Sequence, residues 1–331
     1  MMTPKIASSC IASLTLVGCF ANVETQKEVT VYVSADEQIA REVFTAFTEK
    51  TGINVLWVGD TEASKTTALV QRLLREQKNP VADVFWSSEI LGTIQLAKED
   101  ILEPIDTDFA YAWPAQHRDA EYRWFAFSPR ARVIAFDPQK IAQEEAPKTW
   151  WEFGDAAIAD PRFGTTGTHV AVMALFPEQF AHFLRTIQGK PLLGGNAATV
   201  QQVIDGTAKF AMTDSDDVHA AIARGESISM LYPSHFQGES GGTLLIPNTV
   251  SMIRGCVHPD LATTFVDFML SDEVATLLAK STSHNIPLQQ NVAQKFPDLQ
   301  VINPLQVDFY TAAAMQEEAI TRLMKAQGDE K

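Results

Sequence analysis

A regular alternation of strands, polar turns and helices between residues 29 and 89 limits the possible folds of this chain more than any other feature. Apolar runs rich in β-branched residues predict three strands, at 29–33, 53–58 and 81–86. Helical spacing of apolar residues predicts helices at 36–50, 62–77 and 90–98. A short turn of hydroxyls and carboxylates follows each strand. Because ligands of open parallel α/β sheets bind outside the carboxyl ends of the strands, these turns predict one binding rim.

The rest of the chain predicts a second α/β unit and two connections between the units. Extended runs at 123–128 and 132–136 bracket Pro129 and suit a crossover, and the run 241–253 suits a crossover back. Between them lies a polar loop at 163–168, expected to lead into a helix at 169–175. We therefore expect two lobes. The predicted boundaries are 29–127 for the first lobe, 130–240 for the second, 243–281 for the return to the first, and 284–331 for C-terminal helices of the second.

The N-terminus has the pattern of an export signal. A single lysine precedes an apolar segment at 6–17 that is too short to span a membrane as a mature helix. The segment ends in Leu16-Val-Gly-Cys19, which resembles a bacterial lipobox. We therefore expect residues 1–18 to be a lipoprotein signal, Cys19 to be lipidated, and 19–28 to be a polar tether. The alternative is a plain secretory signal cleaved near Ala21. Either pattern predicts a periplasmic or cell-envelope protein. With the lipoprotein signal, the protein touches the membrane only through its lipid anchor.

Charge and cysteine content exclude several classes of function. The net charge of −15 excludes nucleic acid as a partner, since neutralising phosphates needs a basic surface. Of the three cysteines, two lie in the predicted signal region, which leaves Cys256 alone in the folded part. A single cysteine forms no disulfide within one mature chain, and we expect Cys256 to be a small buried residue.

Six segments spread over nearly the whole mature chain carry a family resemblance. They are Val29-Thr-Val-Tyr-Val-Ser-Ala-Asp36, Ala82-Asp-Val-Phe-Trp86, Phe163-Gly-Thr-Thr166, Thr213-Asp-Ser-Asp-Asp217, Leu245-Ile-Pro-Asn-Thr249, and His258-Pro-Asp-Leu-Ala262 with Phe265-Val-Asp-Phe-Met-Leu-Ser-Asp-Glu273. In their order and spacing the chain resembles the iron(III) type of ABC-transporter substrate-binding proteins, in the family of extracellular solute-binding proteins. The resemblance implies a bilobed α/β periplasmic-binding-protein-like fold of type II. It also implies delivery of a bound ligand to a permease and its ATPase.

The resemblance implies ferric iron as the bound ligand, but the chain departs from the family's ligand set. Members commonly bind iron with two consecutive tyrosines, and the matching place here is Ser215-Asp-Asp217. A metal site would therefore be rich in carboxylates, which suit a hard cation. The candidate ligands are Asp36, Glu37, Glu62, Glu89, Asp214, Asp216 and Asp217. The alternative for the acids near helix starts is that they cap helices and favour the helix dipole.

Hydroxyl groups at the predicted turns form a second candidate site, for an anion. Such groups lie where free N–H groups at helix N-termini bind anions. The candidate residues are Tyr32, Ser34, Ser64, Ser88, Thr165, Thr166 and Tyr232. They could hold an anion that completes a ferric site, or the anionic group of an organic ligand such as a phosphonate or sugar phosphate. We expect His169, His219 and His235 to be surface or capping residues, since no metal-ligand spacing relates them.

The sequence predicts a receptor and not an enzyme. It has no His-Glu-x-x-His helix and no phosphate-binding Gly-Lys-Ser/Thr loop. We expect a monomeric substrate-binding protein of an ABC importer without a catalytic cofactor. Its ligand would be ferric iron, with a synergistic anion, or in the alternative a small anionic organic molecule.

Overall fold

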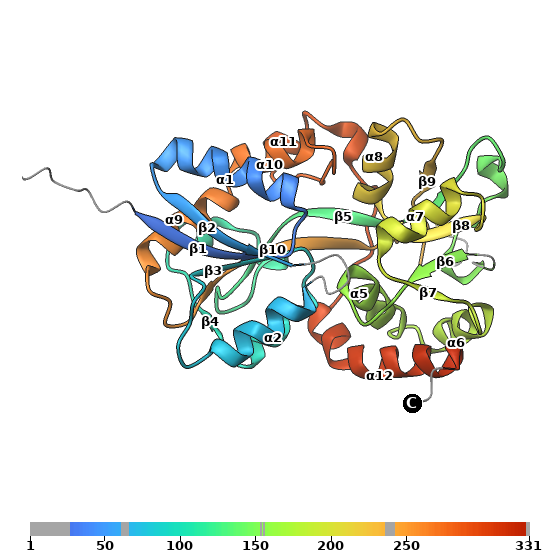
Figure 1. Cartoon of the computed structure of the whole chain (residues 1–331), viewed down its shortest axis with the longest axis horizontal. Helices are drawn as coiled ribbons and strands as arrows, with labels where there is room; N and C mark the ends of the chain where they lie inside the picture. Colours follow the sequence, from blue (N-terminus) through green and yellow to red (C-terminus); the bar gives the residue numbers. More distant parts are fainter. Residues whose placement is uncertain (1–26, 61–65, 153, 155, 236–241, 329–331) are drawn as a thin grey trace, which may run out of the picture.

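The computed structural model describes residues 27–60, 66–152, 154, 156–235 and 242–328 (Figure 1). The predicted signal, Cys19 and most of the tether lie outside these residues, as do Glu62 and Ser64. The molecule has two α/β halves, joined by two long strands that run from one half to the other (Figure 1). None of the described helices combines the length and the apolar character that crossing a membrane requires.

The first half contains a sheet with helices on both faces. Its strands are β1 (Glu28–Val33), β2 (Asn54–Gly59), β3 (Val84–Ser87), β4 (Leu102–Glu103) and part of β10 (Leu245–Ile253). Its helices are α1 (Glu37–Thr51), α2 (Thr67–Glu76), α3 (Leu91–Lys98), α4 (Asp108–Ala112), α9 (Pro259–Met269) and α10 (Asp272–Lys280). Strands β2, β1 and β3 are parallel neighbours, and β10 pairs with β3 antiparallel.

Side chains of successive strand residues point to opposite faces of the sheet and contribute to the two cores of this half. Val31 and Val33 of β1 pack with α1, α9 and α10 on one face of the sheet. Tyr32, between them, points to the opposite face and packs with α2 and α3. The phenol of Tyr32 donates a hydrogen bond to Glu76 at 2.8 Å, so this tyrosine is a core residue with a satisfied hydroxyl.

The second half repeats the arrangement. Its strands are β6 (Ala156–Ala159), β7 (Leu192–Leu193), β8 (Phe210–Asp214), β9 (Ser229–Leu231) and part of β5 (Phe125–Phe136). Its helices are α5 (Gly164–Met173), α6 (Pro177–Thr186), α7 (Asn196–Ile204), α8 (Ser215–Ala223) and α12 (Phe309–Gln327), with α11 (Gln290–Ala293) in the segment before α12. Helices α5, α6 and α12 share one core, and α7 and α8 share the other.

Strands β5 and β10 connect the halves. The first part of β5 pairs with β10, and its second part, from Arg132, pairs with β8 and β9. The two runs predicted on either side of Pro129 are thus one continuous strand. Proline is tolerated here because the ladder with β10 is irregular between Ile246 and Asn248, and irregular pairing leaves room for a residue without an N–H donor. The predicted lobe boundary at 127–130 falls inside this strand.

Two predicted helix starts differ from the structure. Helix α5 begins at Gly164, so the predicted polar loop is largely the first turn of the helix, and Thr165, Thr166 and Thr168 are helical. Helix α2 begins at Thr67, since Thr66 has a φ of 70° and its backbone is not helical. At α5 the polar residues form the first helical turn and not a loop, whereas at α2 the predicted residues 62–65 lie outside the described residues and Thr66 is not helical.

Candidate functional site

An open pocket lies between the two halves, at the ends of several strands, and its space, part of it open to solvent, is about 500 Å³. Its lining residues come from the turn after β1, the turn after β3, strand β5, the end of β6, the start of α5, the start of α7 and the β8–α8 junction. They are Asp36, Ser88, Arg130, Ala159, Asp160, Phe163, Gly164, Thr165, Thr166, Gly194, Gly195, Asn196, Asp214, Asp216 and Asp217. The structure therefore brings together seven of the sequence-predicted residues: Asp36, Ser88, Thr165, Thr166, Asp214, Asp216 and Asp217.

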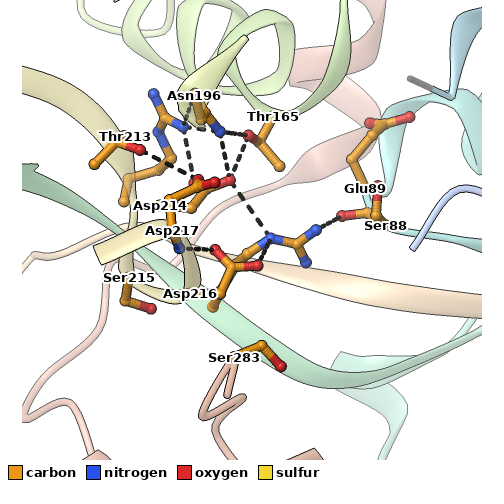
Figure 2. A network of polar contacts seen from close by, with 12 residues as sticks. Ser88, Glu89, Thr165, Asn196, Thr213, Asp214, Ser215, Asp216, Asp217 and Ser283 are labelled. Carbon is orange, nitrogen blue, oxygen red and sulfur yellow. Dashed lines mark hydrogen bonds and ion pairs between the residues drawn. The ribbon is translucent and has the colours of Figure 1, made fainter. Parts of the chain in front are cut away.

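Asp214 is the most enclosed carboxylate of the pocket. It ends β8 and stands at the N-cap position of α8, but its side chain forms no capping hydrogen bond. Instead the carboxylate accepts hydrogen bonds from Arg132 Nη1 at 2.8 Å, Asn196 Nδ2 at 2.9 Å and the Thr165 hydroxyl (Figure 2). Asp214 is thus committed to holding β5, α5 and α7 together at the pocket wall.

Two buried arginines of β5 supply the positive charge of the site. Arg130 and Arg132 are two residues apart on a strand, so both side chains point to the same face. Arg130 Nε lies 3.4 Å from Asp214 and 3.3 Å from Asp216, and its Nη2 donates to the Ser88 carbonyl oxygen at 2.7 Å. Arg130 therefore connects the acids of the second half to a turn of the first half.

The arginines also set the protonation state of Asp214. Burial alone would raise the pKa of its carboxyl group, but the charges of Arg132 and Arg130 and the hydrogen bond from Thr165 outweigh burial and lower the pKa. Burial opposes the charge of Arg130 as well, and the nearby Asp216 and Asp214 carboxylates more than compensate, so the pKa of Arg130 is raised. Both groups are charged in the folded protein.

A chain of hydrogen bonds behind Arg132 reaches two fully buried histidines. Arg132 Nε donates to His169 Nδ1 at 3.2 Å, so the proton of neutral His169 is on Nε2. That proton faces His235 Nε2 at 3.0 Å, and His235 Nδ1 faces the carbonyl oxygen of Gly242 at 2.8 Å. Burial lowers the pKa of both imidazoles, to about 4 for His235. The prediction that these two histidines are surface or capping residues was wrong, because their partner is the buried Arg132.

The acids at the start of α8 converge on the pocket. Asp214, Asp216 and Asp217 each offer one carboxylate oxygen within 4.8 Å of the others. The first turn of the helix places them there, with Asp217 accepting a hydrogen bond from Thr213 Oγ1 at 3.2 Å (Figure 2). Asp36 lines the same pocket from the first half, at the start of α1. Like charges this close favour a bound cation.

Glu89 lies beside the pocket and not in its lining. Its carboxylate accepts hydrogen bonds from the backbone N–H groups of Leu91 and Gly92 at 2.6 and 2.8 Å and from Thr168 Oγ1 at 2.8 Å. Burial raises the pKa of Glu89, and these hydrogen bonds oppose the rise. Glu89 therefore acts as a cap for α3 that also contacts α5 of the other half.

The other predicted residues are dispersed. Ser34 donates to Ser88 Oγ at 3.2 Å in a buried hydroxyl cluster with Thr66. Glu37 pairs with Arg41 on the exposed surface of α1. Tyr32 is in the core, and Tyr232, 43% exposed after β9, is not among the lining residues of the pocket.

Sequence reasoning missed Arg130, Arg132 and Asn196. A signal for the arginines was present, because two charged residues at alternate positions interrupt an otherwise apolar strand, Phe125-Ala-Phe-Ser-Pro-Arg-Ala-Arg-Val-Ile-Ala-Phe136. Charges inside a buried strand need partners, and the acids of the β8–α8 junction were already candidates. No comparable signal marks Asn196.

Comparison with known proteins identifies the family. Residues 33–276 match the profile of the bacterial extracellular solute-binding proteins, which is most of the chain. The chain belongs to this family. Its members are transport components and not enzymes, so the protein is a solute-binding protein.

Relatives of this solute-binding protein include ferric-iron proteins. It is 26% identical over 316 residues to the major ferric iron-binding protein of Neisseria meningitidis serogroup A, covering 91% of this chain and 93% of that protein. Its fold matches the ferric binding protein from Campylobacter jejuni with a TM-score of 0.79 and 22% identity, covering 90% of this chain and 99% of that one.

A sugar-phosphate complex has the same fold. The periplasmic binding protein AfuA from Actinobacillus pleuropneumoniae, with fructose-6-phosphate bound, matches with a TM-score of 0.73 and 17% identity. The match covers 92% of this chain and 100% of that one. The bilobed type II fold expected from the sequence is confirmed by these structures.

Proposed function

We propose that this solute-binding protein is the receptor of an ABC importer and that it binds ferric iron in the pocket between its halves. The observation that carries the proposal is the convergence of the Asp214, Asp216 and Asp217 carboxylates at that pocket. Oxygen ligands suit a hard cation such as Fe(III). The ferric proteins among its relatives support the choice of ion.

The charge balance of the pocket also favours a cation. Five carboxylates, those of Asp36, Asp160, Asp214, Asp216 and Asp217, line the pocket, and three guanidinium groups, those of Arg130, Arg132 and Arg162, pair with some of them. One unit of charge per group leaves the site with a net charge of −2. Asp214 is engaged by Arg132, so in this proposal Asp216, Asp217 and Asp36 carry the direct contacts to iron.

The start of α5 would hold the synergistic anion. Phe163, at the N-cap, has no side-chain capping bond, so the first N–H groups of α5 lack a side-chain cap at the pocket edge. Thr165 and Thr166 lie in that first turn, and both are hydrogen-bonded to Asn196. Helix N-termini with hydroxyl groups bind anions well, and such an anion would complete the coordination of the metal.

A second candidate ligand is a small organic molecule with a phosphate or phosphonate group. It is favoured by the buried Arg130, whose planar guanidinium suits such groups, and by the absence of any tyrosine among the described lining residues. The fructose-6-phosphate complex of AfuA supports this candidate.

Metal analysis of protein purified without chelator tests the first candidate. We expect close to one iron per chain, lost in Asp216→Asn and Asp217→Asn. Glu273→Gln, which changes an exposed acid paired with Lys50, serves as a control that keeps its iron. Protein that takes up no iron from Fe(III)-citrate would overturn the ferric proposal.

A melting screen with hexose phosphates and alkyl phosphonates tests the second candidate. Stabilisation that is lost in Arg130→Lys would assign the pocket to a phosphorylated ligand, because lysine keeps the charge and loses the two-pronged donor. If the protein shows neither iron uptake nor stabilisation by these compounds, both candidates lose their support.

We also propose the export and assembly steps that the sequence predicts. Residues 1–18 would be removed, Cys19 would carry the lipid, and the loaded monomer would dock on a permease driven by its ATPase. One curated relative, named a probable ABC transporter periplasmic-binding protein of Sinorhizobium fredii, supports the importer context. Mass spectrometry of the N-terminus checks the lipid, and Cys19→Ala should release the protein from membranes.

A further inference from the structure

Two histidines from different parts of the chain face each other beside the pocket. His219 lies on α8, and His284 lies in the segment between α10 and α11. Their ring centroids are 4.7 Å apart and the ring planes are inclined by 53°, so the rings are tilted and not stacked. Both residues are half-buried.

The imidazole nitrogens of this pair have no hydrogen-bond partner among the residues that the structure describes. The other close pair, His169 and His235, is different, since its ring nitrogens contact Arg132, each other and Gly242. Half-buried imidazoles without partners retain a lone pair for a ligand.

We propose that His219 and His284 form a binding site for a divalent transition-metal ion, separate from the acidic pocket. Imidazole nitrogen binds such ions at about 2.0–2.1 Å. An ion at that distance from one nitrogen of each ring stands roughly 3.2 Å from each centroid. Centroids 4.7 Å apart then subtend an angle of roughly 90° at the ion, which suits adjacent positions of a square-planar or octahedral site. Water would fill the remaining positions.

His284 has a φ of 46°, in the left-handed region that few residues other than glycine adopt. The neighbouring Ser283 and Asn285 line an open pocket that shares Asp36, Ser88, Arg130 and Asp216 with the acidic pocket (Figure 2 shows Ser283 and Asp216). An ion bound by the histidine pair would therefore tie α8, which carries Asp216 and Asp217, to the segment after α10.

The donor set predicts which ion binds. Imidazole suits copper, nickel and zinc, and affinity for such sites is greatest for Cu²⁺. Ferric iron prefers oxygen ligands, so the histidine pair and the proposed iron pocket select different ions. The two proposals can fail independently.

Titration of the purified protein with Cu²⁺, monitored by calorimetry and by electron paramagnetic resonance, tests the site. We expect one ion per chain with coupling to two nitrogens, and binding at least about tenfold weaker in His219→Ala and in His284→Asn. Asparagine tolerates a positive φ, so His284→Asn removes the ligand and keeps the backbone.

Two control variants make the result decisive. His182→Ala, on the exposed surface of α6, and Asp216→Asn, in the acidic pocket, should both keep the copper signal. Copper binding that survives both histidine variants, or a signal without nitrogen coupling, would overturn the proposal. Loss of copper in Asp216→Asn alone would place the ion in the acidic pocket and also overturn it.

Discussion

At the scale of single residues, the pocket depends on charges that are buried together. Arg132 is fully buried and Asp214 nearly so, and Arg132 Nη1 lies 2.8 Å from the Asp214 carboxylate, while Arg132 Nη2 has no hydrogen-bond partner among the described residues. A buried ion pair contributes little net stability, yet removing one partner is costly because the other charge stays without water. The pair therefore fixes the shape of the site more than it stabilises the fold.

Asp214→Asn tests whether removing one partner of the buried ion pair is costly. The change removes the charge opposite Arg132 and Arg130, and we expect the free energy of unfolding to fall by about 3–5 kcal/mol. Urea denaturation measures the loss. Glu37→Gln, in the exposed pair with Arg41, should cost less than about 1 kcal/mol. Equal effects of the two changes would contradict the buried-pair interpretation.

The buried histidines predict how stability depends on pH. The pKa of His235 is lowered to about 4 and that of His169 lies well below its ordinary value, both chiefly through burial. As the pH falls below about 6.5, the unfolded chain takes up protons on these rings while the folded protein does not. Stability is therefore present above that pH and is lost as the pH falls towards 4, by up to about 1.4 kcal/mol per pH unit for each ring.

Denaturation at pH 7, 6 and 5 checks this dependence. His235→Gln removes one of the titrating rings, and we expect the slope of stability against pH to decrease by about one proton. An unchanged slope would mean that His235 is protonated in the folded protein.

At the scale of elements, the start of α5 shapes one edge of the pocket. Gly164 opens this helix with a φ of +56°, and a Cβ there would meet nothing within 4 Å. Glycine is thus required at this position by the positive φ of the backbone, and not by a lack of space for a side chain. Only in this conformation does the chain turn so that Thr165 and Thr166 face Asn196.

Gly164→Ala should therefore destabilise the protein by roughly 1–2 kcal/mol, the cost of a left-handed conformation for a residue with a side chain. It should also weaken ligand binding, measured by calorimetry with Fe(III)-citrate and with a hexose phosphate. Gly194→Ala is the matched control, since Gly194 lines the same pocket, has equally open space and has no positive φ. Similar losses at both positions would show that the backbone conformation is not the cause.

At the scale of the whole molecule, side chains connect the two halves beside the pocket. Thr168 of α5 donates to Glu89 of the β3–α3 turn, Arg130 donates to the Ser88 carbonyl oxygen, and Thr67 donates to the Arg162 carbonyl oxygen at 3.2 Å. These contacts hold the halves together around β5 and β10. Helix α12 adds to them, because it packs on α3 of the first half and on α5 of the second.

Thr168→Val should shift the halves apart. Valine has a similar volume but cannot donate, so the buried Glu89 carboxylate loses a partner, at a cost of about 1–3 kcal/mol. We expect a larger radius of gyration by small-angle X-ray scattering without ligand. Thr67→Val, which removes a more exposed contact, should change the radius less. An unchanged radius in Thr168→Val would show that other contacts maintain the arrangement.

The sequence by itself determined the α/β class, most of the elements and the position of the acids after β8. Local pattern was enough there, because strand alternation, helical spacing and first-turn polar residues act over a few positions. It did not determine that Tyr32 faces the core while Asp36 faces the pocket, since that depends on which face of the sheet each helix covers.

Only the tertiary structure decided what surrounds the acids. Arg130 and Arg132 come from a strand more than eighty positions before Asp214 and Asp216, and Asn196 comes from a third element. Charge partners in a buried site are chosen by distance in space, which chain folding creates and no local pattern encodes. For the same reason His219 and His284, far apart in the sequence, become neighbours only when α8 and the segment after α10 pack together.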